Sequence, residues 1–129
     1  MKAAQIRNYG DPSVVSIIND APKPIAGEGQ VLVEVHSSSI NPVDTALRSG
    51  YLQQIAPLQL PVTLGTDISG VVAELGSGVD ELSVGDKIYG SAIVLARGSG
   101  AFAEYALLAL VRLLNFRRDW TLIRPQPCP

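Results

Sequence analysis

Residues suited to binding and catalysis gather near the middle of the chain, around a short predicted helix. Asn41 is a good N-terminal cap, Pro42 suits the first helical position, and Asp44 places negative charge near the positive helix end. Gly50 can end the helix in the left-handed conformation, which predicts about two turns over Asn41 to Ser49. The helix comes after a strand, so its polar N-terminus is exposed where that strand ends, a sound place for a binding site. The alternative interpretation is that Asn41 and Asp44 merely cap the helix.

Other polar residues have plainer interpretations. His36 is the only conventional proton-transfer side chain, and no serine or cysteine nucleophile motif accompanies it, which favours a surface or hydrogen-bonded structural histidine. Asp86 stands between a glycine and a lysine, where it suits a tight turn better than catalysis. Thr66 and Asp67 come after a glycine in a turn that they can cap or brace.

The composition narrows the class of protein. A chain of 129 residues with 47% hydrophobic and 17% charged residues suits one globular domain with a buried core. A formal net charge of −2 and no Lys/Arg run give nucleic-acid binding little support. No apolar run approaches the ~18 residues that span a membrane, and the first residues do not resemble a signal peptide. The single cysteine, Cys128, cannot form an internal disulfide, so we expect a cytoplasmic protein.

Short strands separated by glycine and proline account for most of the chain. Gln30 to Ser37 has an apolar period of two, which favours a strand with one buried face. Ile68 to Leu75 is a second strand, and Ile88 to Ala96, interrupted at Gly90, supplies one or two more. The pattern favours a barrel or sandwich over a helical bundle.

The last stretch of the chain differs abruptly in composition. Leu107 to Leu114 is dense in leucine, and three of the final five residues are prolines. We interpret residues 109–129 as an atypical tail outside the fold. A frame change after about Leu107 is our hypothesis for its origin, and re-reading the coding DNA in other frames tests it.

Four short motifs stand in a fixed order along the chain. They are Asn41-Pro42-Val43-Asp44, Arg48-Ser49-Gly50-Tyr51, Leu64-Gly65-Thr66-Asp67-Ile68-Ser69-Gly70 and Gly85-Asp86-Lys87-Ile88-Tyr89-Gly90. Together they resemble the N-terminal, GroES-like half of the zinc-independent medium-chain dehydrogenase/reductases, the quinone oxidoreductase and zeta-crystallin branch. The resemblance covers roughly residues 1–108. It implies a mainly β fold, a GroES-like, partly open β-barrel with one or two short helices.

The resemblance also implies an activity, hydride transfer from NADPH to a quinone, enone or related electrophile, at a site split between two domains. It makes Asn41, Asp44 and Tyr51 the catalytic residues, with Asn41 and Thr66 contacting the cofactor. Asn41 can donate and accept hydrogen bonds, so it can hold a carboxamide or a substrate carbonyl. Tyr51 has a plainer interpretation as an aromatic packing residue in a proline-rich loop.

Zinc chemistry is not expected. Zinc-dependent relatives place a cysteine where Asn41 stands and a His-Glu pair where Thr66 and Asp67 stand. A catalytic zinc needs about three such ligands and an open position, and Asn41 and Thr66 are poor substitutes. The chain has one cysteine and one histidine, too few for either type of zinc site in these relatives.

A candidate nucleotide motif occurs late in the chain. The segment Gly98 to Ala103 fits the dinucleotide fingerprint G-x-G-x-x-A, with Asp119 at a suitable distance. Only ten residues come after Asp119, too few for a complete βαβ sheet, so the segment is better interpreted as the barrel-closing strand. We therefore expect the NADPH-binding domain to be absent and the isolated chain to have weak or no reductase activity. The alternative function is a non-catalytic binding or homodimerisation module that uses the apolar tail as its surface.

Overall fold

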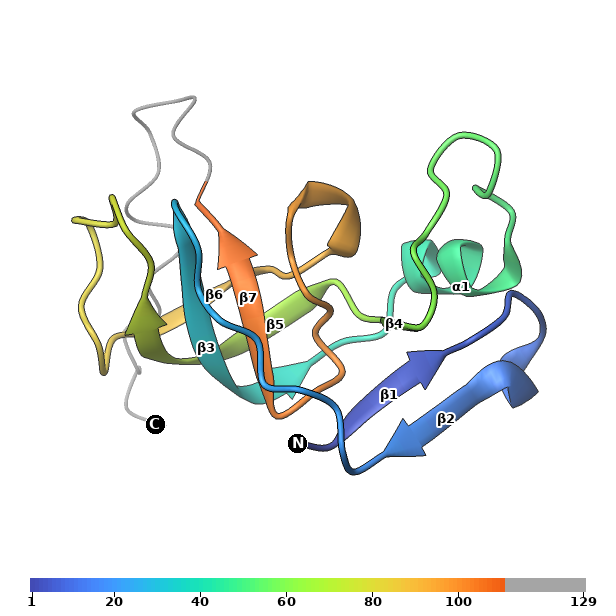
Figure 1. The fold of residues 1–129 in the computed structure, drawn as a ribbon, viewed down its shortest axis with the longest axis horizontal. Coiled ribbons are helices and arrows are strands. Elements are labelled where there is room, and N and C mark those ends of the chain that lie inside the picture. The colour runs from blue at the N-terminus through green and yellow to red at the C-terminus, as the bar shows by residue number, and fades with distance from the viewer. Residues whose placement is uncertain (111–129) are drawn as a thin grey trace, which may run out of the picture.

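The computed structural model describes residues 1–110, so nearly all of the predicted tail lies outside the described residues. Within residues 1–110 the chain forms strands, one α-helix and two short 3-10 helices (Figure 1). The strands are β1 (Ala3–Ile6), β2 (Val15–Ile18), β3 (Gln30–Ser38), β4 (Val62–Thr63), β5 (Asp67–Leu75), β6 (Lys87–Ser91) and β7 (Tyr105–Ala109). The helices are η1 (Pro12–Val14), α1 (Pro42–Ser49) and η2 (Val94–Ala96).

The strands form two antiparallel sheets. The smaller sheet has the order β2-β1-β4, and the larger has the order β6-β5-β3-β7. A bridge between Ala3 and Ala103 joins the two, supported by a hydrogen bond from Ala4 N to Phe102 O (2.8 Å). Among residues 1–110 no strand ladder closes the sheets into a complete barrel. The predicted mainly β, partly open architecture is confirmed.

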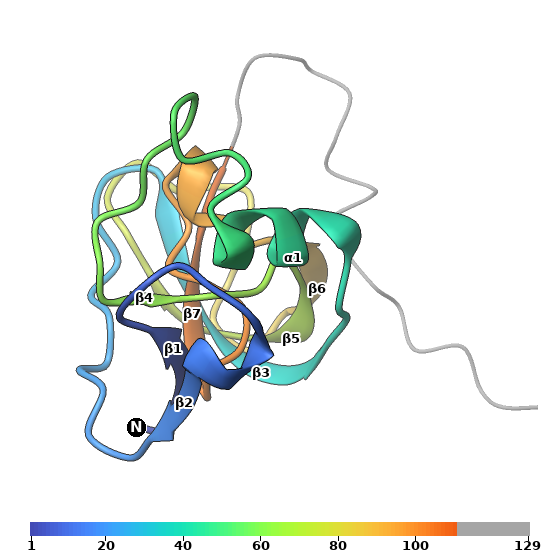
Figure 2. The same cartoon turned by 90° about the vertical axis from the view of Figure 1, so that its right-hand side faces the viewer.

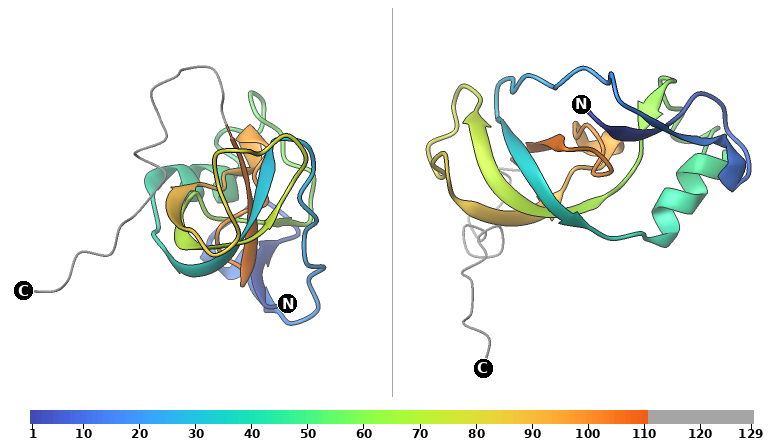
Figure 3. Two further views of the ribbon diagram at one scale, coloured as in Figure 1. Left: turned by 90° about the vertical axis from the view of Figure 1, so that its left-hand side faces the viewer. Right: turned by 90° about the horizontal axis from the view of Figure 1, so that it is seen from below.

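The larger sheet carries the main apolar core. β3 lies between β5 and β7, and Figure 3 shows β3 and β5 side by side along the molecule. The buried side chains of this core come from all four strands, and they include Val31, Val33, Val72, Ile88 and Leu108. Burying an aliphatic side chain of this size contributes about 1.5–3 kcal/mol, so this cluster holds β3 and β5 rigidly in register.

Both faces of β3 are buried near its start, where the sequence predicted only one. The valines are buried as expected, but Leu32, on the opposite face, is also fully buried. Leu32 pairs with Leu107 of β7, and the neighbouring Tyr105 shares this face of the sheet. The connector before β3 lies over it, with Lys23 Nζ 4.2 Å from the centroid of the Tyr105 ring. Local alternation of residues could not predict this cover, because it comes from a separate segment.

Helix α1 begins and ends where the sequence predicted. Asn41 is its N-cap, and Gly50 ends it with a φ of 86°, in the left-handed region. Leu47 packs with Ile6 and Leu64 in a second, smaller core. Figure 1 places α1 at the end of the molecule that holds β1 and β2, and Figure 2 shows this end face on. The small core therefore fixes the helix against the smaller sheet.

The other strand predictions are confirmed, one of them only in part. β5 starts one residue before the predicted Ile68 to Leu75 strand. The run Ile88 to Ala96 splits instead into β6 and the 3-10 helix η2. Its ladder stops because Ser91, the last residue of β6, pairs with Asp67, the first residue of β5.

Candidate functional site

The end of β3 and the start of β5 bring together three of the four residues that the sequence placed at the site. Ser38 pairs with Ile68 in the β3–β5 ladder, so the residues just after β3 lie beside those that precede β5. Asn41 is the N-cap of α1 and Thr66 directly precedes β5. The segments that carry these two residues lie side by side at the end of the β3–β5 ladder. The local sequence of either segment alone does not show this meeting.

Asp44 is the buried link between the two segments, with only 4% of its surface exposed. Its Oδ2 accepts a hydrogen bond from Asn41 N (2.8 Å), the carboxylate half of a capping box. Its Oδ1 accepts from Thr66 Oγ1 (2.8 Å). The carboxylate thus caps α1 and holds the helix to the segment before β5. Asp44 and Thr66 are in contact, as their predicted place in one site requires.

Asn41 points to a second carboxylate. Its Nδ2 donates to Asp67 Oδ2 (2.7 Å) and, more weakly, to Ser39 Oγ (3.3 Å). Ser39 Oγ donates to the same Asp67 oxygen (3.2 Å). From the sequence, Asp67 was expected only to cap or brace a turn, and Ser39 was not singled out. Their only sequence signal was polarity beside Asn41 and Thr66, and the register of β3 on β5 supplies the rest.

We call these five residues the carboxylate cluster: Ser39, Asn41, Asp44, Thr66 and Asp67. Asp44 is buried, Asn41 and Thr66 are half-buried, and Ser39 and Asp67 are exposed. Exposure to solvent thus increases across the cluster, from the buried Asp44 to the exposed Ser39 and Asp67. Side chains placed in this way can be held rigidly and still meet a ligand.

Tyr51 lies apart from the carboxylate cluster. It comes directly after Gly50 at the other end of α1, and eight helical residues span about 12 Å. Its side chain is 83% exposed, so it is not a packing residue within residues 1–110. The described chain does not bring Tyr51 to Asn41, and its predicted role needs a ligand that reaches across the helix.

Two open hollows flank the end of β3. One, of about 510 Å³, lies against the carboxylate cluster and is lined by Ser39, Asp67, Ser37, Ser69 and other residues. Ser37 Oγ and Ser69 Oγ share a hydrogen bond of 2.6 Å on its wall.

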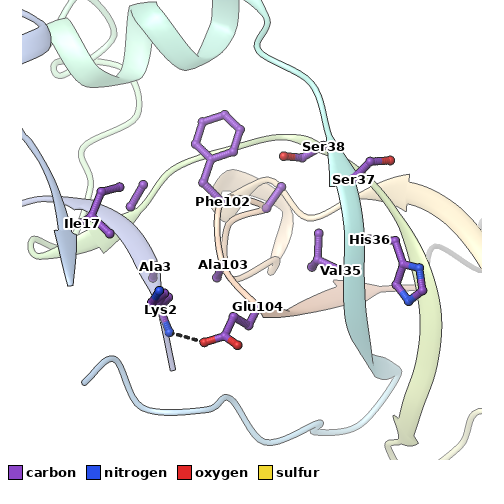
Figure 4. Close-up of a pocket in the computed structure, with 12 residues that line it drawn as sticks. Lys2, Ala3, Ile17, Val35, His36, Ser37, Ser38, Phe102, Ala103 and Glu104 are labelled. Carbon is purple, nitrogen blue, oxygen red and sulfur yellow. Dashed lines mark hydrogen bonds between the residues drawn. The ribbon is translucent and has the colours of Figure 1, made fainter. Parts of the chain in front are cut away.

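The other hollow, of about 440 Å³, lies where the two sheets join (Figure 4). Ile17, Val35 and Phe102 supply apolar surface, and Lys2 N donates to Glu104 Oε1 (2.6 Å) at its lower edge in this view. His36 lines its rim with an exposed side chain, in agreement with its interpretation as a surface histidine. None of the five residues of the carboxylate cluster lines this hollow.

The described residues offer neither a metal cluster nor a membrane-spanning helix. Over residues 1–110 no three His, Cys, Asp or Glu side chains come together as a metal site. None of the helices in this part of the chain has the length and apolar character needed to cross a bilayer. Asp86 accepts a hydrogen bond from Ser83 N (2.8 Å), which confirms its predicted role in a turn.

The glycines of the Gly98 to Ala103 segment serve close packing. A Cβ on Gly98 would lie 2.2 Å from the backbone of Ala92, and one on Gly100 would lie 2.2 Å from Thr63 O. The segment leads into strand β7 and not into the helix that a dinucleotide fingerprint opens. The segment therefore joins β7 to the smaller sheet, as the barrel-closing interpretation predicted.

Comparison with known proteins places the chain in a family. Residues 27–116 match the alcohol dehydrogenase GroES-like domain. Human quinone oxidoreductase is 38% identical over 109 residues, a match that covers 84% of this chain and 31% of the human protein. The chain therefore belongs to the alcohol dehydrogenase GroES-like domain family. Within this family it is similar to the N-terminal part of quinone oxidoreductases.

Solved structures support the same conclusion. The Escherichia coli quinone oxidoreductase complexed with NADPH matches with a TM-score of 0.73 and 26% identity, over 97% of this chain and 33% of that one. A mycobacterial protein complexed with NADPH matches with a TM-score of 0.76 and 28% identity, over 100% of this chain and 35% of that one. The chain thus spans about a third of the length of these relatives. The predicted family and GroES-like fold are confirmed.

Proposed function

We propose that this chain supplies the substrate-side half of an active site that transfers hydride from NADPH to a quinone or enone without zinc. The observation that carries the proposal is the carboxylate cluster, in which Asn41 and Thr66 are hydrogen-bonded to carboxylates and Ser39 and Asp67 line an open hollow. Relatives named quinone oxidoreductase, one of them complexed with NADPH, support the same activity. Asn41, Asp44 and Tyr51 are its proposed catalytic residues, and Asn41 and Thr66 its cofactor contacts.

The described residues fit one end of NADPH. Bound NADPH supplies the hydride, and the half-buried polar atoms of Asn41 and Thr66 suit its nicotinamide end. The phosphate end has no counterpart in residues 1–110, because the glycines at 98 and 100 pack on Ala92 and Thr63. The buried Asp44 carboxylate holds Asn41 and Thr66 in place through its two hydrogen bonds.

The donor set of the cluster does not suit zinc. It contains no cysteine or histidine, and its two carboxylates each accept hydrogen bonds from the chain itself. Zinc ligation by Asp44 would break the cap of α1, so we assign the cluster to metal-independent positioning of the reactants.

The proposal also includes the bounds of the domain and the reductase activity expected of the isolated chain. We place the GroES-like domain at residues 1–108 and assign 109–129 to a tail of frame-changed origin, whose first residue, Ala109, still pairs with Gln30 at the end of β7. The chain alone is then inactive or weakly active, because most of the NADPH surface comes from elsewhere. We also propose a cytoplasmic location, on the single Cys128, and leave homodimerisation through the tail as the alternative role. Sedimentation at several concentrations tests that alternative.

A chimera tests the proposed function. Residues 1–108 replace the matching part of the Escherichia coli quinone oxidoreductase, and NADPH oxidation is measured with 1,4-naphthoquinone as acceptor. We expect turnover by the chimera and weak or no turnover by the chain alone. Asn41→Ala in the chimera is expected to lower kcat/KM by about tenfold, the value of one hydrogen bond of ~1.4 kcal/mol.

Matched controls make this experiment decisive. Asp86→Asn alters a turn carboxylate outside the cluster and is expected to leave chimera turnover unchanged. A folded chimera without turnover contradicts the proposed activity. Turnover by the isolated chain at the rate of the chimera contradicts the half-site.

A further inference from the structure

The side-chain hydrogens of the carboxylate cluster are all used within the cluster. Both Nδ2 hydrogens of Asn41 point to acceptors, Asp67 Oδ2 at 2.7 Å and Ser39 Oγ at 3.3 Å. The hydroxyl of Ser39 donates to Asp67, and the hydroxyl of Thr66 donates to Asp44. Asparagine carries two side-chain hydrogens and each hydroxyl carries one, so no side-chain donor remains.

Asp67 fixes the orientation of the Asn41 amide. In the opposite orientation the amide oxygen would stand 2.7 Å from a carboxylate oxygen, where two acceptors repel each other. With Nδ2 held by Asp67, Oδ1 turns to the side of the first turn of α1. The carbonyl oxygen has two lone pairs, and capping of α1 uses one at most. Asn41 can therefore offer a ligand an acceptor.

We propose that the carboxylate cluster meets its ligand as a hydrogen-bond acceptor surface, with Asp67 as the positioning residue that makes it so. The ligand group that rests on Asn41 is then an N–H or O–H donor and not a carbonyl oxygen. A nicotinamide carboxamide and the hydroquinone product carry such donors, and a quinone does not. This inference rests on the proposed function and decides between the two partners that the sequence left open for Asn41, a carboxamide or a substrate carbonyl.

The quinone carbonyl is consequently not polarised by Asn41. Donation by Asn41 to a carbonyl would cost either its strong bond to the Asp67 carboxylate or its longer bond to Ser39 Oγ, and a carbonyl on the second hydrogen would still have to displace Ser39. In the same hollow the Ser37–Ser69 pair uses one hydroxyl hydrogen for its mutual bond and leaves the other. A carbonyl is better served at that pair than at the cluster.

Binding of matched small molecules to the whole chain tests the proposal. Nicotinamide and 3-acetylpyridine differ by an NH2 against a CH3, and hydroquinone and 1,4-dimethoxybenzene differ by their O–H groups. Each is titrated into ¹⁵N-labelled protein, and the Asn41 side-chain amide signal is monitored by NMR. We expect the donor of each pair to bind about fivefold more tightly than its partner, the worth of one hydrogen bond of ~1 kcal/mol. A preference in the first pair alone indicates that the donor on Asn41 comes from the cofactor. A preference in the second pair alone indicates that it comes from the hydroquinone product.

Substitution of Asp67 tests whether this residue sets the preference for donors. A purely structural role for Asp67 would leave the ratio of affinities within each ligand pair unchanged. Asp67→Asn keeps the size of the side chain but adds an amide donor, so the fivefold preference is expected to fall towards one. Asp86→Asn, a turn carboxylate outside the cluster, keeps the preference. A substitution that only loosened the site would weaken both members of a pair equally and leave their ratio unchanged.

The outcomes are distinct from those of the proposed function. Equal binding within each pair, or tighter binding of the acceptor-only member, overturns the inference even where the chimera turns over. Absence of any ligand effect on the Asn41 amide also overturns it. A chimera without turnover overturns the proposed function and leaves a measured donor preference standing. The wild-type comparison remains decisive if Asp67→Asn does not fold.

Discussion

The two ends of α1 are held by different kinds of contact. At the N-terminus, Asn41 and Asp44 are bound to Thr66 and Asp67, which lie far away in sequence. At the C-terminus, Gly50 ends the helix in the left-handed conformation, Arg48 exchanges hydrogen bonds with the backbone of Gly10, and the Tyr51 side chain beyond is exposed. Side chains of the helix hold the first end to the segment before β5, whereas a glycine turn and contacts to one backbone segment hold the second. The rigid end is therefore suited to orienting a reacting group, and the open end to admitting it.

Removal of the buried Asp44 carboxylate is expected to have the largest effect on the contacts that hold the N-terminus of α1. Asp44→Ala removes the acceptor of both Asn41 N and Thr66 Oγ1 and leaves two donors without it. Since a hydrogen bond to a charged group is worth ~1.5–3 kcal/mol, we expect a loss of about 3 kcal/mol in unfolding free energy. Urea denaturation of the whole chain, monitored by circular dichroism, measures it.

Asp44→Asn is the matched control for this substitution. An amide of the same size keeps one oxygen acceptor, so we expect a loss of about 1 kcal/mol. A loss below about 0.5 kcal/mol for Asp44→Ala would show that the bonds of Asp44 do not hold α1 to β5.

At the opposite end, the test is backbone strain. Gly50→Ala places a side chain at a φ of 86°, with its Cβ 3.2 Å from the Tyr9 side chain. The left-handed conformation costs an alanine about 1–2 kcal/mol, and we expect a loss in this range by the same denaturation. Gly85→Ala is the control, because Gly85 also has a left-handed φ, 96°, but open space around it. The extra loss at Gly50 then measures the Tyr9 contact, and an equal loss at both positions contradicts its importance.

This contrast explains which parts of the molecule the sequence could predict. The caps Asn41 and Gly50, the strand Ile68 to Leu75 and the turn at Asp86 depend on neighbouring residues, and all are confirmed. Residue type and spacing carry enough information for such features.

The features that the sequence missed depend on register between segments. Leu32 is buried on the face of the sheet where Lys23, from the connector before β3, contacts the Tyr105 ring. Asp67 became a partner of Asn41 only through the pairing of β3 with β5, and no local pattern contains that pairing. The sequence therefore predicted the buried half of the carboxylate cluster and not its exposed half.

Asp11 offers a smaller test at the C-terminal end of α1. Hydrogen bonds from the Ser13 side chain and backbone, with a minor contribution from the nearby Arg48 charge, hold the pKa of Asp11 below its ordinary value of 3.8. A lowered pKa in the folded state stabilises the fold above pH 3.8, and this stabilisation is lost as the pH falls through the lower value. We expect Ser13→Ala to be less stable than wild type at about pH 7 and the difference to shrink below pH 3.8. A difference that is constant with pH contradicts this, and denaturation from about pH 2 to about pH 7 measures it.

Tyr51→Ala is expected to have the smallest effect on folding. The Tyr51 side chain is 83% exposed and comes after the turn that Gly50 forms, so its removal takes almost no apolar surface from the core. Exposed substitutions of this kind change stability by about 0.5 kcal/mol or less, and the denaturation midpoint should stay near wild type. A loss above about 1 kcal/mol would mean that Tyr51 supports the loop after α1. With unchanged stability, a lower kcat/KM of Tyr51→Ala in the chimera reports contact with the reactants, because folding no longer explains it.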